Sequence, residues 1–146
     1  MSKQITCGVV FVDTLKQKIL MVHPTNQKDF WDFPKGRREN KETSKEAAIR
    51  EVLEETSICI NEEDKLIDFG EHPYNKHKRI HLFVCYNKDI DFNSLKCTSM
   101  VEKEYTSYPE VDDFKMFSIE EAVTLMCPSM KTVFVWELEQ RIRQHF

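Results

Sequence analysis

The chain has 146 residues, a formal net charge of −4 at pH 7 and a pI near 5.8. Because 40% of its residues are hydrophobic and 32% are charged, with few Gly and Pro, we expect a folded, soluble protein with one core. The acidic balance argues against broad binding to nucleic acid, and no apolar run is long enough to cross a membrane.

The first third of the chain alternates apolar runs with turn signals. Residues 5–12 form an apolar, β-branched run that predicts a buried strand. A turn at 13–18 then leads to 19–22, which predicts its hairpin partner. The polar stretch 23–29 predicts a loop, and the aromatic-rich stretch 30–36 follows it.

The second half predicts three strands and two helices. The strand candidates are 65–74, 79–86 and 113–117, and the helix candidates are a segment capped by Ser118 and the periodic segment 130–143. No pattern predicts structure for 87–107. Mixed strands with two or three helices indicate a layered α/β or α+β fold, and we expect residues 1–146 to form one domain.

The cysteines are scattered, odd in number and never spaced as C-x-x-C; they are Cys7, Cys59, Cys85, Cys97 and Cys127. A zinc site or a disulfide framework is therefore not expected. We predict buried free thiols in a reducing cytoplasm, which would be a host's cytoplasm if the protein is viral. The N-terminal residues lack the pattern of a signal peptide.

The clearest chemical pattern lies between Gly36 and Ile58. Thr43 and Glu46 form a capping-box pattern, so a helix should begin there and end near 56 or 57. Its apolar arc, expected to pack, is Ala48, Ile49, Val52, Leu53 and Thr56. Its acids are Glu51, Glu54 and Glu55, which fall within about a third of the helix circumference.

Clustered carboxylates repel one another, and their hard oxygens suit Mg²⁺ or Mn²⁺. Such a metal site would bind a phosphoanhydride and activate water against it. Arg50 could orient a carboxylate through paired hydrogen bonds. Three basic residues, Lys35, Arg37 and Arg38, surround Gly36 and are candidate phosphate contacts.

Taken alone, a glutamate-rich helix is more often a solvated face than a site. In that case Arg50 forms a surface ion pair worth less than about 1 kcal/mol. The loop residues Lys76 and Lys78 are then solvated charges, and Tyr74 is a packing group.

At fixed spacing, this stretch resembles the box of the Nudix family. The matching positions are Gly36, Glu42, Arg50, Glu51, Val52, Glu54, Glu55 and Ile58. Ser57 stands where the family has glycine, just after the helix, where left-handed backbone is common. We expect serine there to cost about 1 kcal/mol or less of stability and to leave the metal chemistry intact.

The resemblance implies the Nudix fold, a mixed sheet sandwiched between helices, and hydrolysis of a nucleoside diphosphate linked to another moiety. It implies that Glu51, Glu54 and Glu55 bind metal with the carbonyl of Gly36. Arg50 would then orient the glutamates, while Glu42 would support the loop. The catalytic base varies within the family between a box glutamate and a later loop glutamate.

Two further passages resemble the asymmetric dinucleoside tetraphosphate hydrolases of that family. The lead-in 31–36 matches their tryptophan-x-x-proline-lysine-glycine motif, and 109–122 is similar to their C-terminal passage. On this comparison Glu110 matches the later metal-binding or base glutamate, although Met116 replaces the usual tryptophan. The residues resembling their loop that grips adenine and phosphates are Tyr74, Lys76 and Lys78.

The leading hypothesis is therefore a Mg²⁺- or Mn²⁺-dependent hydrolase of a dinucleoside polyphosphate such as diadenosine tetraphosphate. The alternatives are a 5′-triphosphorylated or capped RNA end, a nucleotide sugar, a coenzyme or a damaged nucleoside triphosphate. A non-catalytic nucleotide-sensing module is a different class, and the intact box carboxylates argue against it. No membrane or DNA partner is expected, and the sequence leaves the oligomeric state open.

Overall fold

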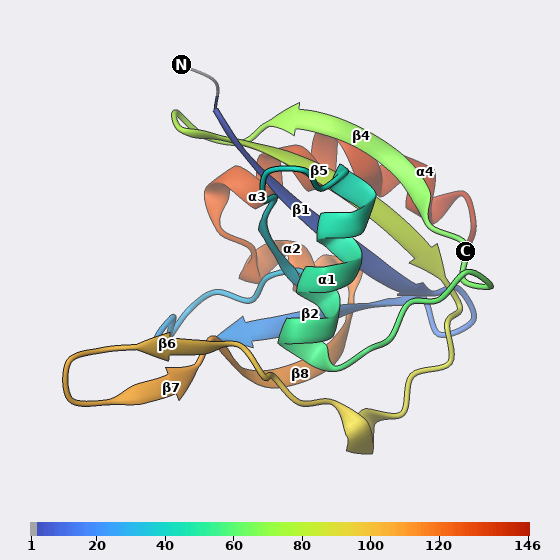
Figure 1. Ribbon diagram of the computed structural model, residues 1–146. Helices are drawn as coiled ribbons and strands as arrows, with labels where there is room; N and C mark the ends of the chain where they lie inside the picture. Colours follow the sequence, from blue (N-terminus) through green and yellow to red (C-terminus); the bar gives the residue numbers. More distant parts are fainter. Residues whose placement is uncertain (1–2) are drawn as a thin grey trace.

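Figure 1 shows a mixed β-sheet with helices on both faces, in a computed structural model that describes residues 3–146. The six-stranded sheet has the order β4-β5-β1-β2-β8, with β3 paired to β1. β1 and β5 are parallel, and the other recorded pairs of this sheet are antiparallel. The strands are β1 (Gln4–Asp13), β2 (Lys18–Pro24), β3 (Lys35–Arg37), β4 (Ile67–Pro73), β5 (Lys78–Tyr86) and β8 (Val111–Ser118). The sandwiched mixed sheet that the resemblance implied is confirmed.

The central strand β1 is buried on both faces. Val10 and Val12 pack in one core, with the C-terminal helices, whereas Val9 and Phe11 pack in a second core, with α1. Successive side chains of a strand point to opposite faces of the sheet. A strand that is buried on both faces therefore needs an unbroken run of apolar residues. The predicted strand at 5–12 and its hairpin partner are confirmed, each slightly longer in the structure.

Helix α1 (Ser44–Thr56) covers one face of the sheet (Figure 1). The hydroxyl of Thr43 accepts a hydrogen bond from the backbone N–H of Glu46 at 3.1 Å, and the Glu46 carboxylate accepts one from the N–H of Thr43 at 2.9 Å. This reciprocal pair is the predicted capping box. The small residues Ala47 and Ala48, with no exposed surface, let the helix lie close to β1.

The end of α1 is fastened by Ser57. This residue has a φ of 67°, the left-handed conformation expected at this position. Its hydroxyl donates a hydrogen bond to the carbonyl of Lys96 at 2.6 Å, and the N–H groups of Thr98 and Ser99 donate to the carbonyl of Glu54. The last turn of the helix is therefore attached to the segment 96–99.

Two burial expectations are wrong. Leu53 is 48% exposed because it lies about 100° around the helix from Val52, which faces the sheet. Cys59 is exposed because its neighbours Ile58 and Ile60 point inward in an extended loop, so the thiol between them points outward. Cys127 is also only partly buried.

The face opposite α1 is covered by the C-terminal helices (Figure 1). They are α2 (Ile119–Leu125), α3 (Pro128–Val133), the π-helical turn η2 (Phe134–Leu138) and α4 (Glu139–Arg143). Ser118 caps α2 as predicted, through a second capping box with Glu121. The periodic segment 130–143 is helical as predicted. Among residues 3–146, no helix combines the length and apolar character that a membrane crossing requires.

The unassigned segment 87–107 contains two short elements. The turn η1 (Phe92–Ser94) precedes β6 (Met100–Glu102), and β6 pairs with β7 (Ser107–Pro109) in a separate hairpin. Figure 1 shows this hairpin projecting from the body of the molecule. The chain enters β8 directly after the hairpin, which places Glu110 at the junction.

The two roles of Ser57 can be separated by substitution. Ser57→Ala loses the hydroxyl but keeps the free-energy cost of placing a side chain in left-handed backbone. Ser57→Gly loses the hydroxyl and removes that conformational cost. Ser57→Ala should therefore be less stable than Ser57→Gly by about 1 kcal/mol, and Ser57→Gly should stay near the wild type. Urea denaturation measures both, and equal stabilities of the two variants would contradict this account.

Candidate active site

Close contact between β1, β3 and α1 brings the predicted site residues together. A Cβ at Gly8 would lie 2.6 Å from both Cβ of Lys35 and the carbonyl oxygen of Pro34, so only glycine lets β3 approach β1 here. A Cβ at Gly36 would lie 2.0 Å from Cδ of Glu51. The Glu51 carboxylate on α1 therefore lies directly against the backbone of Gly36 on β3. The two elements together form one site.

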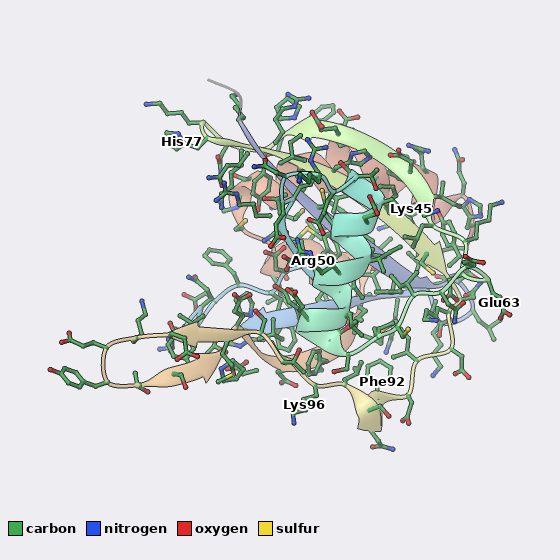
Figure 2. All side chains as sticks on the ribbon, in the orientation of Figure 1. Lys45, Arg50, Glu63, His77, Phe92 and Lys96 are labelled. Atoms are coloured by element: carbon green, nitrogen blue, oxygen red, sulfur yellow. The ribbon has the colours of Figure 1, made fainter. Side chains whose placement is uncertain are left out.

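Arg50, labelled on α1 in Figure 2, connects the acidic residues through its guanidinium. Its guanidinium donates two hydrogen bonds to Glu42, Nε to Oε2 at 2.6 Å and Nη2 to Oε1 at 2.9 Å. Nη1 donates to Glu51 Oε1 at 2.7 Å and lies 3.4 Å from both carboxylate oxygens of Glu54. Nη2 also donates to the carbonyl of Arg37 at 3.0 Å. One cation thus holds the loop before α1 and two acids on α1 in a fixed arrangement.

This network changes the pKa values of its members. Hydrogen bonds from Arg50 lower the pKa of Glu42 to about 2, and the bonds with Glu42 and Glu51 keep the pKa of Arg50 above its usual value. Both groups therefore stay charged over the whole physiological pH range. The bidentate geometry is the strong form of a carboxylate–guanidinium pair.

Two of the three helix acids are buried rather than solvated. Glu51 and Glu55 are 8% and 7% exposed. Burial raises the pKa of Glu51, and the negative charges of Glu54 and Glu110 raise it further. Burial raises the pKa of Glu55 to about 8, although Lys35 lies nearby and its backbone N–H donates to Glu55 Oε1 at 3.2 Å. The solvated-face interpretation is therefore wrong for these two acids.

The donor set suits a divalent cation. In residues 3–146, no three His, Cys, Asp or Glu side chains are arranged as a ready-made metal cluster. Arg50 donates a hydrogen bond to Glu51, and the backbone N–H of Lys35 donates one to Glu55. The crowded oxygens nevertheless fit such a cation, because bound positive charge would offset the burial, and the smaller mutual repulsion, that raise the pKa of both acids.

A cavity of about 450 Å³ opens beside these acids. Its lining includes three charged residues, Lys35, Glu55 and Glu110, and two aromatic residues, Phe30 and Trp31. The other lining residues are Val22, Pro24, Gln27, Asp32, Phe33, Val111 and Cys127. The pocket therefore combines a charged end with aromatic surface, the combination that a nucleotide needs.

Glu110 reaches this pocket from a distant part of the chain. Its N–H donates to the carbonyl of Ser99 and its carbonyl accepts from the N–H of Thr25, both at 2.9 Å. These bonds hold the backbone of Glu110 between Ser99, just before β6, and Thr25, just after β2. The structure thus brings Glu110 together with Glu55 and Lys35, as the proposed site requires.

The predicted substrate contacts divide into two groups. Lys35 lines the pocket, and the hydroxyl of Tyr74 lies 3.5 Å from Sγ of Cys127 in its wall. Arg37 is exposed on β3, while Lys76 and Lys78 are exposed at the β4–β5 turn. These last three side chains do not line the pocket.

Asp32 is a site residue that the sequence analysis missed. Its carboxylate binds Nζ of Lys35 at 2.8 Å. Burial alone would lower the pKa of Lys35, but Asp32 keeps that pKa above its usual value. The spacing of three residues between Asp32 and Lys35 was the signal in the sequence that could have indicated this ion pair. Nothing in the sequence pointed to Cys127.

The family comparison agrees with this geometry. The family model described as NUDIX domain matches residues 2–136, which is most of the chain. The chain is a member of the Nudix family. As a Nudix enzyme it is a pyrophosphohydrolase that acts on nucleoside diphosphate-linked substrates, and the family typically depends on a divalent metal.

Individual relatives support the assignment. A protein of Enterobacteria phage T4, described as "Uncharacterized 17.7 kDa protein in e-segB intergenic region", is 32% identical over 139 residues, covering 88% of this chain and 91% of the relative. A C. elegans Ap4A hydrolase in a binary complex matches with a TM-score of 0.66 at 20% identity, over 89% of this chain and 92% of that chain. The NUDIX domain of Shewanella oneidensis NrtR complexed with ADP ribose matches with a TM-score of 0.70 at 12% identity, over 97% and 90%. At such identities the solved structures show a common fold.

The contact between Gly36 and Glu51 predicts a specific defect. In Gly36→Ala the new methyl group should displace the Glu51 carboxylate, which is the flexible end of a side chain, so stability should change little. Misplacing this group should lower hydrolysis roughly hundredfold. Gly8→Ala is the contrasting variant, because its methyl group meets the backbone of Pro34 and should lower stability instead. Wild-type turnover by Gly36→Ala would contradict the assignment.

The pair between Glu42 and Arg50 predicts a pH dependence of stability. The pKa of Glu42 falls from its usual 4.5 to about 2 on folding, so its stabilisation is full above about pH 4.5 and is lost as the pH falls toward 2. Glu42→Gln should cost about 1–2 kcal/mol at neutral pH, and the difference from the wild type should shrink below about pH 4.5. Urea denaturation across this range measures it. The control Glu62→Gln, on an exposed loop, should lose no stability at neutral pH. A stability difference between Glu42→Gln and the wild type that stays unchanged at acid pH would count against the ion pair.

Proposed function

We propose that this enzyme hydrolyses a dinucleoside polyphosphate, such as diadenosine tetraphosphate, with Mg²⁺ or Mn²⁺. The observation that carries the proposal is the pocket whose lining combines the aromatic residues Phe30 and Trp31 with the charged residues Lys35, Glu55 and Glu110. An aromatic wall suits a base, and the charged wall suits the phosphates attached to it. The name of the C. elegans Ap4A hydrolase, which shares the fold, supports the same substrate class.

In this proposal Glu51, Glu54, Glu55 and Glu110 hold the metal, with the carbonyl of Gly36. A bound divalent cation supplies charge neutralisation on the phosphates and a lowered pKa for the attacking water. Arg50 keeps Glu51 in place, and its weak 3.4 Å contacts leave the oxygens of Glu54 available to accept the proton of that water. The ammonium group of Lys35, oriented by Asp32, neutralises a phosphate oxygen in the pocket.

A 5′-triphosphorylated or capped RNA end is the second candidate substrate. It is favoured by exposed cations that lie outside the pocket and could contact further phosphates, namely Arg37, Lys76 and Lys78. Nucleotide sugars remain a third class, in view of the ADP ribose bound by the Shewanella domain.

Glu54→Gln tests the central role of the helix acids. The substitution removes the proton acceptor while keeping the shape of the side chain, so turnover should fall about 10²-fold or more. Hydrolysis in ¹⁸O-labelled water, with products resolved by mass, identifies which phosphorus is attacked. The comparison should include dinucleoside polyphosphates, nucleotide sugars, coenzymes and triphosphorylated RNA. The matched control Glu63→Gln removes an exposed charge far from the pocket, and equal turnover of the two variants would refute the role of Glu54.

A further inference from the structure

We propose that His23 and Asp112 are positioning residues for the active site, because their contact holds a β-bulge that directs Glu110 into the pocket. Neither side chain lines the pocket itself. The inference rests on the proposed role of Glu110 as a metal ligand. It deepens that role by naming the two side chains that keep this acid in place.

The bulge is one extra residue in β8. The pairing of β2 with β8 is regular up to His23, which lies opposite Asp113. The next pair is Pro24 with Val111, so Asp112 has no partner of its own on β2. Proline has no N–H for the ladder, and within sheets it is found at edges and bulges. Two aspartates of β8 therefore lie against the single residue His23, as in a bulge that opposes two residues to one.

The extra residue sets the direction of the chain next to Glu110. Side chains alternate along a regular strand, so residues three apart lie on opposite faces. Val111 and Phe114 nevertheless pack in the same small cluster, beside Val22. The bulge has thus shifted the alternation by one residue. Without it, Val111 would leave this cluster and Glu110 would rotate with it, because a slip of one residue moves side chains to the other face.

One short contact fastens the extra residue to β2. Nδ1 of His23 lies 2.6 Å from Oδ1 of Asp112, and the ring N–H donates to the carboxylate. The two side chains are 20% and 44% exposed. A partly exposed pair of this kind contributes little to global stability. Its effect is therefore local, on the conformation of the bulge.

The backbone carries this local effect to both sides of the pocket. Before the bulge, Val22 and Asp32 exchange two N–H···O bonds of 2.8 Å, and Asp32 is the partner of Lys35. After it, the N–H of Thr25 donates to the carbonyl of Glu110 at 2.9 Å. The bulge lies between these two attachments, so a change in its shape must move one side of the pocket relative to the other.

The imidazole also supports the aromatic part of the pocket lining. The ring centroids of His23 and Trp31 are 5.1 Å apart, and Trp31 meets Phe117 edge-on at 5.0 Å. The ring of Trp31 thus lies in contact with both neighbours. One histidine therefore connects the aromatic residue of the pocket with the bulge beside its acid.

Manganese binding, measured from the EPR signal of free Mn²⁺ without nucleotide, tests the inference. Asp112→Asn keeps the shape of the side chain but removes the charge that the imidazole binds. It should raise the Kd for Mn²⁺ about tenfold, as expected when a group that orients a metal ligand is lost. Asp113→Asn is the matched control, because Asp113 is exposed, carries the same charge and accepts the N–H of Phe114 instead. Its Kd should stay within about twofold of the wild type, since an exposed charge is largely screened by salt.

Substitution of the histidine gives a test by rescue. His23→Asn keeps an N–H near the place of Nδ1 and should bind Mn²⁺ almost as the wild type does. His23→Leu loses that donor and should behave like Asp112→Asn. Urea midpoints equal to the wild type confirm that the variants are folded.

A double-mutant cycle shows whether Asp112 acts through Glu110. In a Glu110→Gln background, Asp112→Asn should cause no further loss of Mn²⁺ binding. Amide hydrogen exchange, measured by NMR, adds a readout that needs no metal. The N–H groups of Thr25 and Glu110 should exchange about fivefold to tenfold faster in Asp112→Asn, because their hydrogen bonds weaken, and at the wild-type rate in Asp113→Asn.

The outcomes separate this inference from the proposed function. If Asp112→Asn and Asp113→Asn have equal effects, or if the losses from Asp112→Asn and Glu110→Gln add, the pair does not position Glu110. Cleavage of diadenosine tetraphosphate by the wild type would leave the proposed function standing in that case. If Asp112→Asn selectively accelerates exchange of the two amides while Glu110→Gln leaves Mn²⁺ binding unchanged, the pair does hold Glu110 in place and the proposed metal-binding role of Glu110 fails.

Discussion

The site depends on one guanidinium that stabilises a cluster of buried carboxylates. Arg50 binds Glu42 and Glu51 closely and lies near Glu54, in a crevice that also contains the buried Glu55. Without such a partner, buried carboxylates repel one another and lose their hydration, which costs several kcal/mol for each ion. The arrangement keeps Glu42 ionised while the pKa values of Glu51 and Glu55 are raised. The crevice is therefore short of positive charge, which is the electrostatic condition for binding a divalent cation.

Two glycines make this cluster geometrically possible. Gly8 lets β3 lie against β1, and Gly36 leaves room for the carboxylate of Glu51. The same short strand ends at Arg37, whose carbonyl accepts a hydrogen bond from Arg50 and which lines a second cavity beside the loop before α1. The three residues of β3 thus connect the acidic helix with the pocket, so the spacing of the lead-in and the box follows from the sheet.

Local signals in the sequence predicted most of the fold elements. The predicted elements include the capping box at Thr43, the cap at Ser118, the central hairpin, the strands around the β4–β5 turn and the left-handed Ser57, and all of them follow from interactions within a few residues. The segment 87–107 gave no such signal, because β6 and β7 have three residues each and periodicity cannot be recognised over so short a length. The exposure of Leu53 was missed for a related reason. Helical spacing predicts which residues share an arc, but the width of the buried arc depends on the neighbouring sheet.

The sequence by itself determined the acidic helix, the arginine within it and the basic lead-in, because these depend on helical rotation and on fixed spacing along the chain. Only the tertiary structure decided that Glu51 and Glu55 are buried, that Asp32 holds Lys35, and that Glu110 meets them across about 55 residues of chain from Glu55. It also separated Lys35, in the pocket, from Arg37 and Lys78, along β1. These relations depend on strand pairing between distant segments, and burial and electrostatic coupling arise only after the sheet has brought those segments together.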